Sequence, residues 1–94
     1  MSASSAVLSP EQRIQQAITI LQRIADDTGV PRNIRRACTE SIKMLQSKKY
    51  SPALRASNVI SMLDECGQDP NIPLFARTAI WQAVSLLEGI KDEE

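Results

Sequence analysis

Apolar side chains recur every three or four residues through most of the chain, which is the period of a helix that buries one face. In the first such stretch the apolar positions include Ile14, Leu21 and Ile24, and polar side chains fill the opposite side. Three further stretches show the same alternation. The pattern predicts four amphipathic helices, near residues 10–26, 31–47, 52–66 and 73–90.

Serine, proline and glycine mark the ends of these helices. Ser9-Pro10 and Ser51-Pro52 each place a serine cap before a proline at the first helical position. Pro31 and Pro73 mark the starts of the second and fourth helices. Gly29 follows the first helix and is expected to take the left-handed conformation that ends many helices. Such short connections make consecutive helices antiparallel neighbours.

The second half of the chain repeats the first at an offset of 42 residues. The offset aligns Pro31 with Pro73, and it also aligns residues 9–46 as a whole with residues 51–88. A solenoid of helical pairs is an alternative, but it needs about three repeats to cover its core. The sequence therefore predicts an all-α fold, a four-helix antiparallel bundle built from two repeated helical hairpins.

Length and composition set the expected domain organisation. A chain of 94 residues makes one domain. We expect this domain over residues 9–90, after a flexible segment 1–8 and before an acidic tail 91–94. The start of the chain lacks the features of a secretory signal, and no stretch approaches the roughly 20 apolar residues of a membrane span. A cytoplasmic protein without a membrane partner is expected.

The two cysteines fall on the apolar faces. At the 42-residue offset Cys38 aligns with Ile80, and Cys66 aligns with Ile24. A free thiol in such a position behaves as a small hydrophobic group. We expect both to be reduced core thiols that form neither a disulfide nor a metal site.

The residue types for catalysis are sparse. The sequence contains no histidine, which is the commonest general base. Asp26 and Asp27 are adjacent and project to different sides, and Asp64 and Glu65 lie outside the apolar stripe of their helix. The lone glycines do not form a phosphate-binding loop. We therefore expect no enzymatic activity, no catalytic residues, no cofactor and no metal.

The duplicated turns carry aspartate and arginine at matching positions. Asp27 and Asp69 precede Arg35 and Arg77, respectively. The structural interpretation is that each aspartate caps its turn and forms an ion pair with the following arginine, which fixes how each hairpin closes. The functional interpretation is a pair of symmetry-related anion sites. We favour the structural one.

Positive charge is concentrated in the first half. Residues 1–50 have a balance of +4 and residues 51–94 a balance of −4, while the whole chain is neutral. The basic face of the second helix and the following linker provide a candidate nucleic-acid surface, made of Arg32, Arg36, Lys43, Lys48 and Lys49. No aromatic side chain lies among them for base stacking. RNA binding is therefore the second interpretation of function.

The fourth helix differs from the second on its outer face. Where the second helix has Arg32, Arg36, Thr39 and Lys43, the 42-residue offset places Leu74, Thr78, Trp81 and Ser85, with Phe75 beside them. The alternative is that Trp81 packs sideways between helices or lies under Val7 and Leu8. The interpretation that we favour is a protein-protein interaction or self-association module that uses this face.

Several phrases of this sequence resemble a known family. They are Val30-Pro31-Arg32-Asn33-Ile34-Arg35, Asp69-Pro70-Asn71-Ile72-Pro73, Ala76-Arg77-Thr78 and Ile80-Trp81. Over most of residues 10–90 the chain is similar to a small archaeal family that has only an "uncharacterised protein family" designation. The resemblance implies an all-α bundle in an archaeal cytoplasm, and it implies neither an activity nor site residues.

Overall fold

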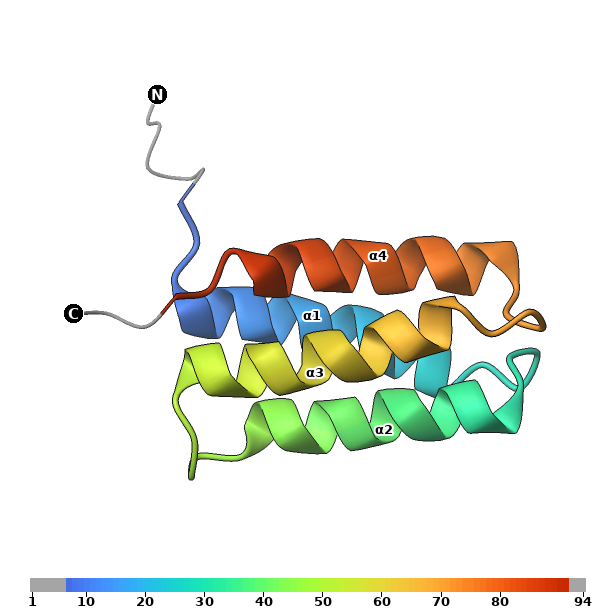
Figure 1. Ribbon diagram of the computed structural model, residues 1–94, viewed down its shortest axis with the longest axis horizontal. Helices are drawn as coiled ribbons and strands as arrows, with labels where there is room; N and C mark the ends of the chain where they lie inside the picture. The colour runs from blue at the N-terminus through green and yellow to red at the C-terminus, as the bar shows by residue number, and fades with distance from the viewer. Residues whose placement is uncertain (1–6, 92–94) are drawn as a thin grey trace.

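The computed structural model describes residues 7–91, and this part of the chain forms four α-helices and contains no strand (Figure 1). The helices are α1 (Pro10–Ala25), α2 (Arg32–Gln46), α3 (Pro52–Gly67) and α4 (Leu74–Glu88). Their bounds lie within two residues of those predicted from the apolar pattern. The predicted flexible segment 1–8 and acidic tail 91–94 fall largely outside the described residues.

Local capping explains where α1 and α3 begin. The hydroxyl of Ser9 accepts a hydrogen bond from the backbone N–H of Gln12 at 3.1 Å, and Gln12 Oε1 accepts one from the Ser9 N–H at 2.8 Å. The hydroxyl of Ser51 accepts from the N–H of Leu54 at 3.2 Å. Both serines therefore satisfy a free donor of the first helical turn.

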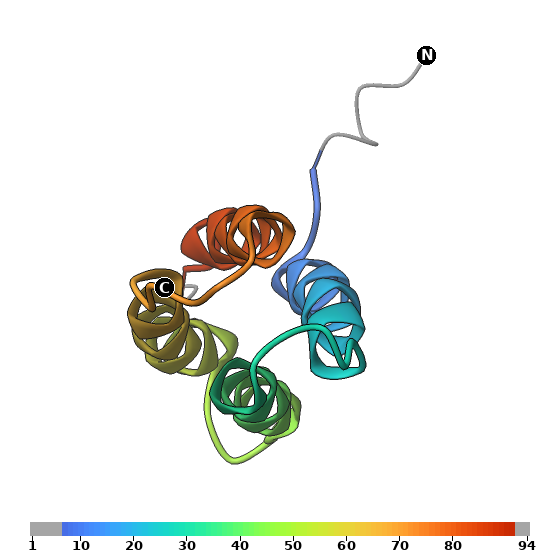
Figure 2. The ribbon, with the colours of Figure 1, turned by 90° about the vertical axis from the view of Figure 1, so that its right-hand side faces the viewer.

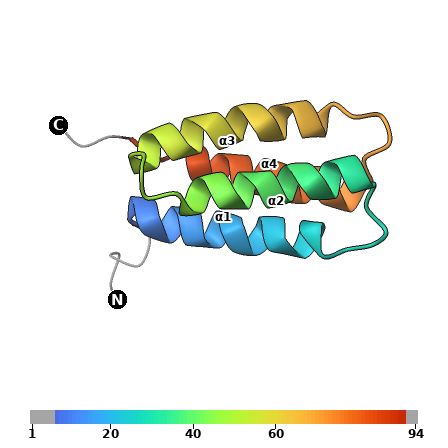
Figure 3. The ribbon, with the colours of Figure 1, turned by 90° about the horizontal axis from the view of Figure 1, so that it is seen from below.

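The helices are arranged in a ring, in which each packs against the helices before and after it (Figure 2). The ring closes between α1 and α4, and consecutive helices run in opposite directions (Figure 3). Short connections produce this arrangement because they leave no length to cross the bundle. The predicted four-helix antiparallel bundle is confirmed.

One apolar core fills the centre of the ring, and all four helices contribute to it. Fully buried examples are Leu21, Ile34, Leu63 and Ile80, one from each helix. Ser41 is also fully buried, and its hydroxyl lies 4.0 Å from the Met62 sulfur. Among the described residues, no helix is long and apolar enough to cross a membrane.

The predicted burial of both cysteines is confirmed, because Cys38 on α2 and Cys66 on α3 are buried, free thiols. The pKa of the Cys38 thiol is raised to about 12, chiefly by burial and to a smaller extent by the neighbouring Cys66. Burial is also the main cause of the raised pKa of Cys66, followed by the charges of Asp69 and Glu65. Both thiols are therefore protonated near neutral pH.

An arginine is the fourth residue of every helix, at positions 13, 35, 55 and 77. Arg13 joins the start of α1 to the end of α4, because its Nη1 donates to the carbonyl of Leu86 at 3.0 Å. A Cβ on Gly89 would overlap this guanidinium. A larger residue at position 89 would therefore displace the Arg13 guanidinium from the Leu86 carbonyl.

Arg55 makes more side-chain hydrogen bonds than any of the other three arginines, and its side chain is only 3% exposed. Its Nη1 donates to the carbonyl of Leu45 at 2.7 Å, and its Nε donates to the carbonyl of Tyr50 at 3.1 Å. Its Nη2 lies 2.8 Å from Glu11 Oε2. One side chain thus links the end of α2, the α2–α3 connection and the start of α1.

Both turn aspartates bond to the backbone of their own turns. Asp27 Oδ1 accepts from the N–H of Gly29 at 2.8 Å, and Asp69 Oδ1 accepts from the N–H of Asn71 at 2.8 Å. The two bonds are 42 residues apart and support the internal duplication inferred from the sequence. The prediction of a left-handed Gly29 is wrong, because none of the described glycines has a positive φ.

The predicted ion pairs Asp27–Arg35 and Asp69–Arg77 are also wrong. The salt bridges among residues 7–91 both involve Glu11 and include neither pair. Arg35 Nε instead donates to the carbonyl of Val30 at 2.9 Å, while the buried Nε of Arg77 has no hydrogen-bond partner. Each aspartate instead accepts a backbone N–H of its own turn, and Arg35 donates to a carbonyl in the connection that precedes its helix.

Candidate functional site

The outer face of α4 carries large apolar side chains that remain exposed to solvent. Leu74 is 73% exposed and Trp81 is 56% exposed. Together with the exposed Thr78 and Ser85 they form what we call the α4 outer row, with steps of four, three and four residues. These steps keep the four side chains within a narrow sector on one side of the helix, away from the core.

The indole of Trp81 leans toward the end of α3. A Cβ on Gly67 would lie 3.7 Å from Trp81 Nε1, which is ordinary van der Waals contact. The nitrogen edge of Trp81 therefore lies near Gly67 of α3, while more than half of the Trp81 surface stays exposed. Val7 does not shield it as a buried flap, because Val7 is itself 78% exposed.

Phe75 extends the apolar surface toward α1. It is 54% exposed and lines a hollow between the C-terminal part of α1 and the start of α4. Ile20 of α1 and Ala79 of α4 lie in the same hollow, with Arg23 and Asp27 also lining it. The exposed large apolar side chains of α4 are thus Leu74 and Trp81 in the α4 outer row and Phe75 on its flank.

The matching row on α2 is polar and basic. Arg32, Arg36, Thr39 and Lys43, which we call the α2 outer row, are all exposed. No carboxylate among the described residues lies within 4.0 Å of a cation of this row. Its three positive charges are therefore open to a partner.

The two linker lysines lie beyond the end of α2. Both are exposed, and Lys48 Nζ lies 4.0 Å from Glu11 Oε1. The side chain of Lys48 is 80% exposed, so this ion pair is held weakly. The five basic residues singled out in the sequence therefore extend along α2 and past its end, with Arg32 at one extreme and Lys49 at the other.

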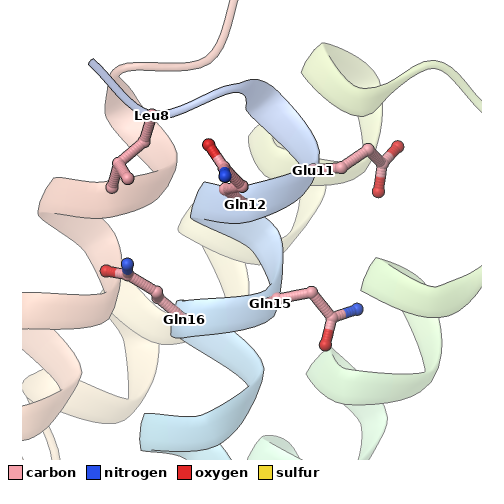
Figure 4. Close-up of a pocket in the computed structure, with 5 residues that line it drawn as sticks. All are labelled: Leu8, Glu11, Gln12, Gln15 and Gln16. Carbon is pink, nitrogen blue, oxygen red and sulfur yellow. The ribbon is translucent and has the colours of Figure 1, made fainter. Parts of the chain in front are cut away.

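A third surface feature is a shallow hollow beside the start of α1 (Figure 4). It is lined by Leu8, Glu11, Gln12, Gln15 and Gln16. Glu11 and Gln15 point to one side and Leu8 and Gln16 to the other, so these polar groups do not converge on one point (Figure 4). Glu11 is engaged with Arg55, and Gln12 caps the helix.

The turns at the opposite end of the bundle are joined by one hydrogen bond. Asn33 Nδ2 donates to Asp69 Oδ2 at 2.8 Å, which connects the first hairpin to the second. The N–H of Asn71 and the Asn33 amide both hold the pKa of Asp69 below its usual value, in that order of importance. Within residues 7–91, no three acidic or cysteine side chains gather closely enough to hold a metal ion.

A comparison with protein families decides where the chain belongs. The model of the Uncharacterised protein family (UPF0147) matches residues 1–90. The chain belongs to this family. The resemblance inferred from the paired turn phrases is thereby confirmed.

Curated UPF0147 proteins from archaea are similar to parts of the chain. The protein of Sulfolobus acidocaldarius is 53% identical over 49 residues, which cover 52% of this chain and 55% of that protein. The protein of Sulfurisphaera tokodaii is 58% identical over 43 residues, which cover 46% of this chain and 48% of that protein. The chain thus spans about half the length of the curated relatives that it matches.

Two solved structures resemble the whole bundle. The crystal structure of the unknown function protein MMP1188 has a TM-score of 0.86 at 38% identity, over 92% of this chain and 98% of that one. The crystal structure of a UPF0147 protein from Thermoplasma acidophilum has a TM-score of 0.80 at 32% identity, over 87% of this chain and 98% of that one. The UPF0147 bundle is therefore shared across these proteins, and its function is argued below from the surface of this chain.

Proposed function

We propose that this UPF0147 protein is a non-enzymatic protein-protein interaction module that binds its partner through the α4 outer row and Phe75. The observation that carries the proposal is the exposure of Leu74, Phe75 and Trp81 on one helix. Burying a large apolar side chain contributes about 1.5–3 kcal/mol, so leaving three exposed forfeits stability that the fold could otherwise gain. A partner that covers them recovers it.

The composition of this surface is that of a binding hot spot. Tryptophan is among the residues that contribute most at interfaces, particularly when smaller residues around it exclude water. Thr78 and Ser85 flank Trp81 along the α4 outer row and offer little bulk of their own.

A photo-crosslinking experiment with matched positions tests the proposal. Thr78→p-benzoyl-phenylalanine places the reactive group in the α4 outer row, and Thr39→p-benzoyl-phenylalanine places it at the matching exposed site of α2. After irradiation in extract from cells that contain the native protein, we expect a discrete protein adduct from position 78 and none from position 39. Leu74→Asp should remove that adduct while helicity by circular dichroism stays near wild type.

The outcomes separate the possible partners. Adducts of equal intensity from both positions, or none from position 78, would overturn the proposal. An adduct at twice the chain mass identifies a second copy, and a band of another mass, analysed by mass spectrometry, identifies a different protein. A nucleic-acid adduct from position 39 alone supports the second candidate function.

The second candidate is an accessory RNA-binding role for the α2 outer row. It is favoured by the three exposed cations Arg32, Arg36 and Lys43, none of which has a carboxylate partner among the described residues. Such cations bind phosphates by releasing counterions, so affinity falls steeply with salt. Arg13, Arg35 and Arg55 are already committed to backbone carbonyls.

Replacement of all three exposed cations by alanine tests this role. If α2 binds RNA, a fluorescently labelled single strand should bind the Arg32/Arg36/Lys43 triple alanine variant at least tenfold more weakly at about 50 mM salt. The slope of log affinity against log salt should be shallower for the variant than for wild type, by the amount expected for the loss of roughly three phosphate contacts. Equal weak binding by wild type and variant would remove this candidate.

A further inference from the structure

The spacing of the α4 outer row is the same in both directions, because its steps are four, three and four residues. Large and small side chains alternate along it, in the order Leu74, Thr78, Trp81, Ser85. Suppose that a second α4 packs antiparallel to the first, with the midpoints of the two rows aligned. Leu74 then faces Ser85 of the second copy, and Trp81 faces Thr78. Each large side chain then meets a small one, which is the condition for close helix packing.

We propose that the partner of this surface is a second copy of the chain, and that the two α4 helices pack antiparallel in this register. This deepens the proposed function and rests on it. A two-fold axis between Thr78 and Trp81 makes the contact isologous and closed, so association stops at the dimer. The spacing of four and three residues is also that of a coiled-coil seam, which keeps one narrow row facing the partner.

Charge supports the choice of a second copy. A two-fold axis brings identical surfaces together, so any concentration of like charge at its centre opposes pairing. The α4 outer row contains no charged residue, so pairing two copies of it brings no like charges together. The same register on α2 would place Arg32 opposite Lys43 of the other copy, which excludes that helix from an equivalent contact.

The opposite orientation fits less well. In a parallel pair Trp81 would face Trp81 and Leu74 would face Leu74, while Thr78 and Ser85 would face their own copies across gaps. Pairs of large side chains would then hold the helices apart, and pairs of small side chains would leave gaps, so the helices could not pack closely. The side-chain sizes on this row therefore specify direction as well as register.

The area available is small. A standard interface covers about a tenth of a small protein's surface on each partner, which is on the order of 600 Å² of the 5979 Å² here. We expect one helical row with Phe75 on its flank to reach only the low end of that class. The dimer is therefore reversible, and we expect it to populate above roughly 100 µM.

Mixed disulfide trapping tests register and direction together. Leu74→Cys and Ser85→Cys variants are purified separately, and each is oxidised alone and in an equimolar mixture. In the proposed dimer two cysteines at position 74 lie about 16 Å apart along the axis, too far for a disulfide. We expect a disulfide dimer in the mixture only, joining position 74 of one copy to position 85 of the other.

Two controls complete the test. Wild type under the same oxidant should stay free of disulfides, because Cys38 and Cys66 are buried. By light scattering, Thr78→Lys should weaken dimerisation at least tenfold, because it places two cations near the axis, whereas Thr39→Lys on α2 should leave it unchanged.

Disulfide dimers from a single variant would overturn the antiparallel register while leaving α4 as the contact surface. A monomer up to about 1 mM, with no disulfide in the mixture, would overturn self-association. In that case a position-78 photo-adduct with a different protein leaves the proposed function standing. Loss of both the disulfide and the adduct removes both proposals.

Discussion

Arg55→Ala is expected to lower the free energy of unfolding by about 3 kcal/mol, which corresponds to a fall in Tm of roughly 15 °C for a domain of this size. Arg55 is one of two buried polar or charged residues among the described part of the chain, and it donates to two backbone carbonyls. The change removes both donors and leaves a cavity where the side chain passes through the packing.

The largest part of this loss comes from the carbonyl of Leu45. Leu45 is fully buried at the end of α2, and its carbonyl accepts the 2.7 Å bond from Arg55 Nη1. An unsatisfied buried acceptor costs about 1–3 kcal/mol. Tyr50 is exposed, so water can replace the bond to its carbonyl at little cost.

Glu11 contributes less than the bond length suggests. It lies 2.8 Å from Arg55 Nη2, but its side chain is 51% exposed, so solvent screens the pair. Glu11→Gln should cost less than about 1 kcal/mol. Arg55→Lys should recover little of the alanine loss, because a single ammonium cannot reach carbonyls of both α2 and the connection together with Glu11.

Urea denaturation of the four proteins measures these differences. Equal m-values would show that only stability has changed. If Arg55→Ala unfolds within about 0.5 kcal/mol of wild type, the three hydrogen bonds of Arg55 do not hold the bundle together. If Glu11→Gln is as damaging as Arg55→Ala, the ion pair and not the carbonyl bonds is the main contribution.

The sequence was sufficient for what depends on neighbouring residues. The helices follow from apolar spacing, and the starts at Ser9 and Ser51 follow from caps that bond to the third residue of the same helix. The turn bonds of Asp27 and Asp69 are equally local, and their capping role was predicted. The predicted pairing of each aspartate with an arginine linked residues that are farther apart in the sequence, and that prediction was wrong.

The role of Arg55 depends on groups that are distant in sequence. Glu11 is 44 residues away, and nothing in either segment alone indicates that the two meet. Arg13 and Arg55 occupy matching positions at the 42-residue offset, and both donate to the end of another helix. This correspondence is a sequence signal for the two positions, but it does not indicate their partners.

The α4 surface shows the same limit. Helical periodicity places Trp81 on the outer face, but the direction of a side chain depends on its rotamer and on its neighbours. The sequence therefore left two alternatives, an exposed indole and one packed sideways. In the structure the indole of Trp81 has its nitrogen edge near Gly67 and remains mostly exposed.

The buried thiol of Cys38 predicts a loss of stability at alkaline pH. Burial raises its pKa from about 9 to about 12 in the folded protein. Below pH 9 the thiol is protonated in both states and the folded protein has its full stability. As the pH rises from 9 toward 12, the thiol ionises in the unfolded chain only, so the unfolded state is increasingly favoured.

Comparison of wild type with Cys38→Ala isolates this effect, because all other titrating groups are common to both proteins. At pH 7 the alanine variant should be less stable by about 1 kcal/mol, since it leaves a small cavity. Each pH unit above 9 should cost wild type about 1.4 kcal/mol more than the variant. By pH 11 the difference in urea midpoint should therefore have vanished or changed sign. Parallel curves from pH 7 to 11 would mean that Cys38 ionises as readily in the bundle as in the unfolded chain.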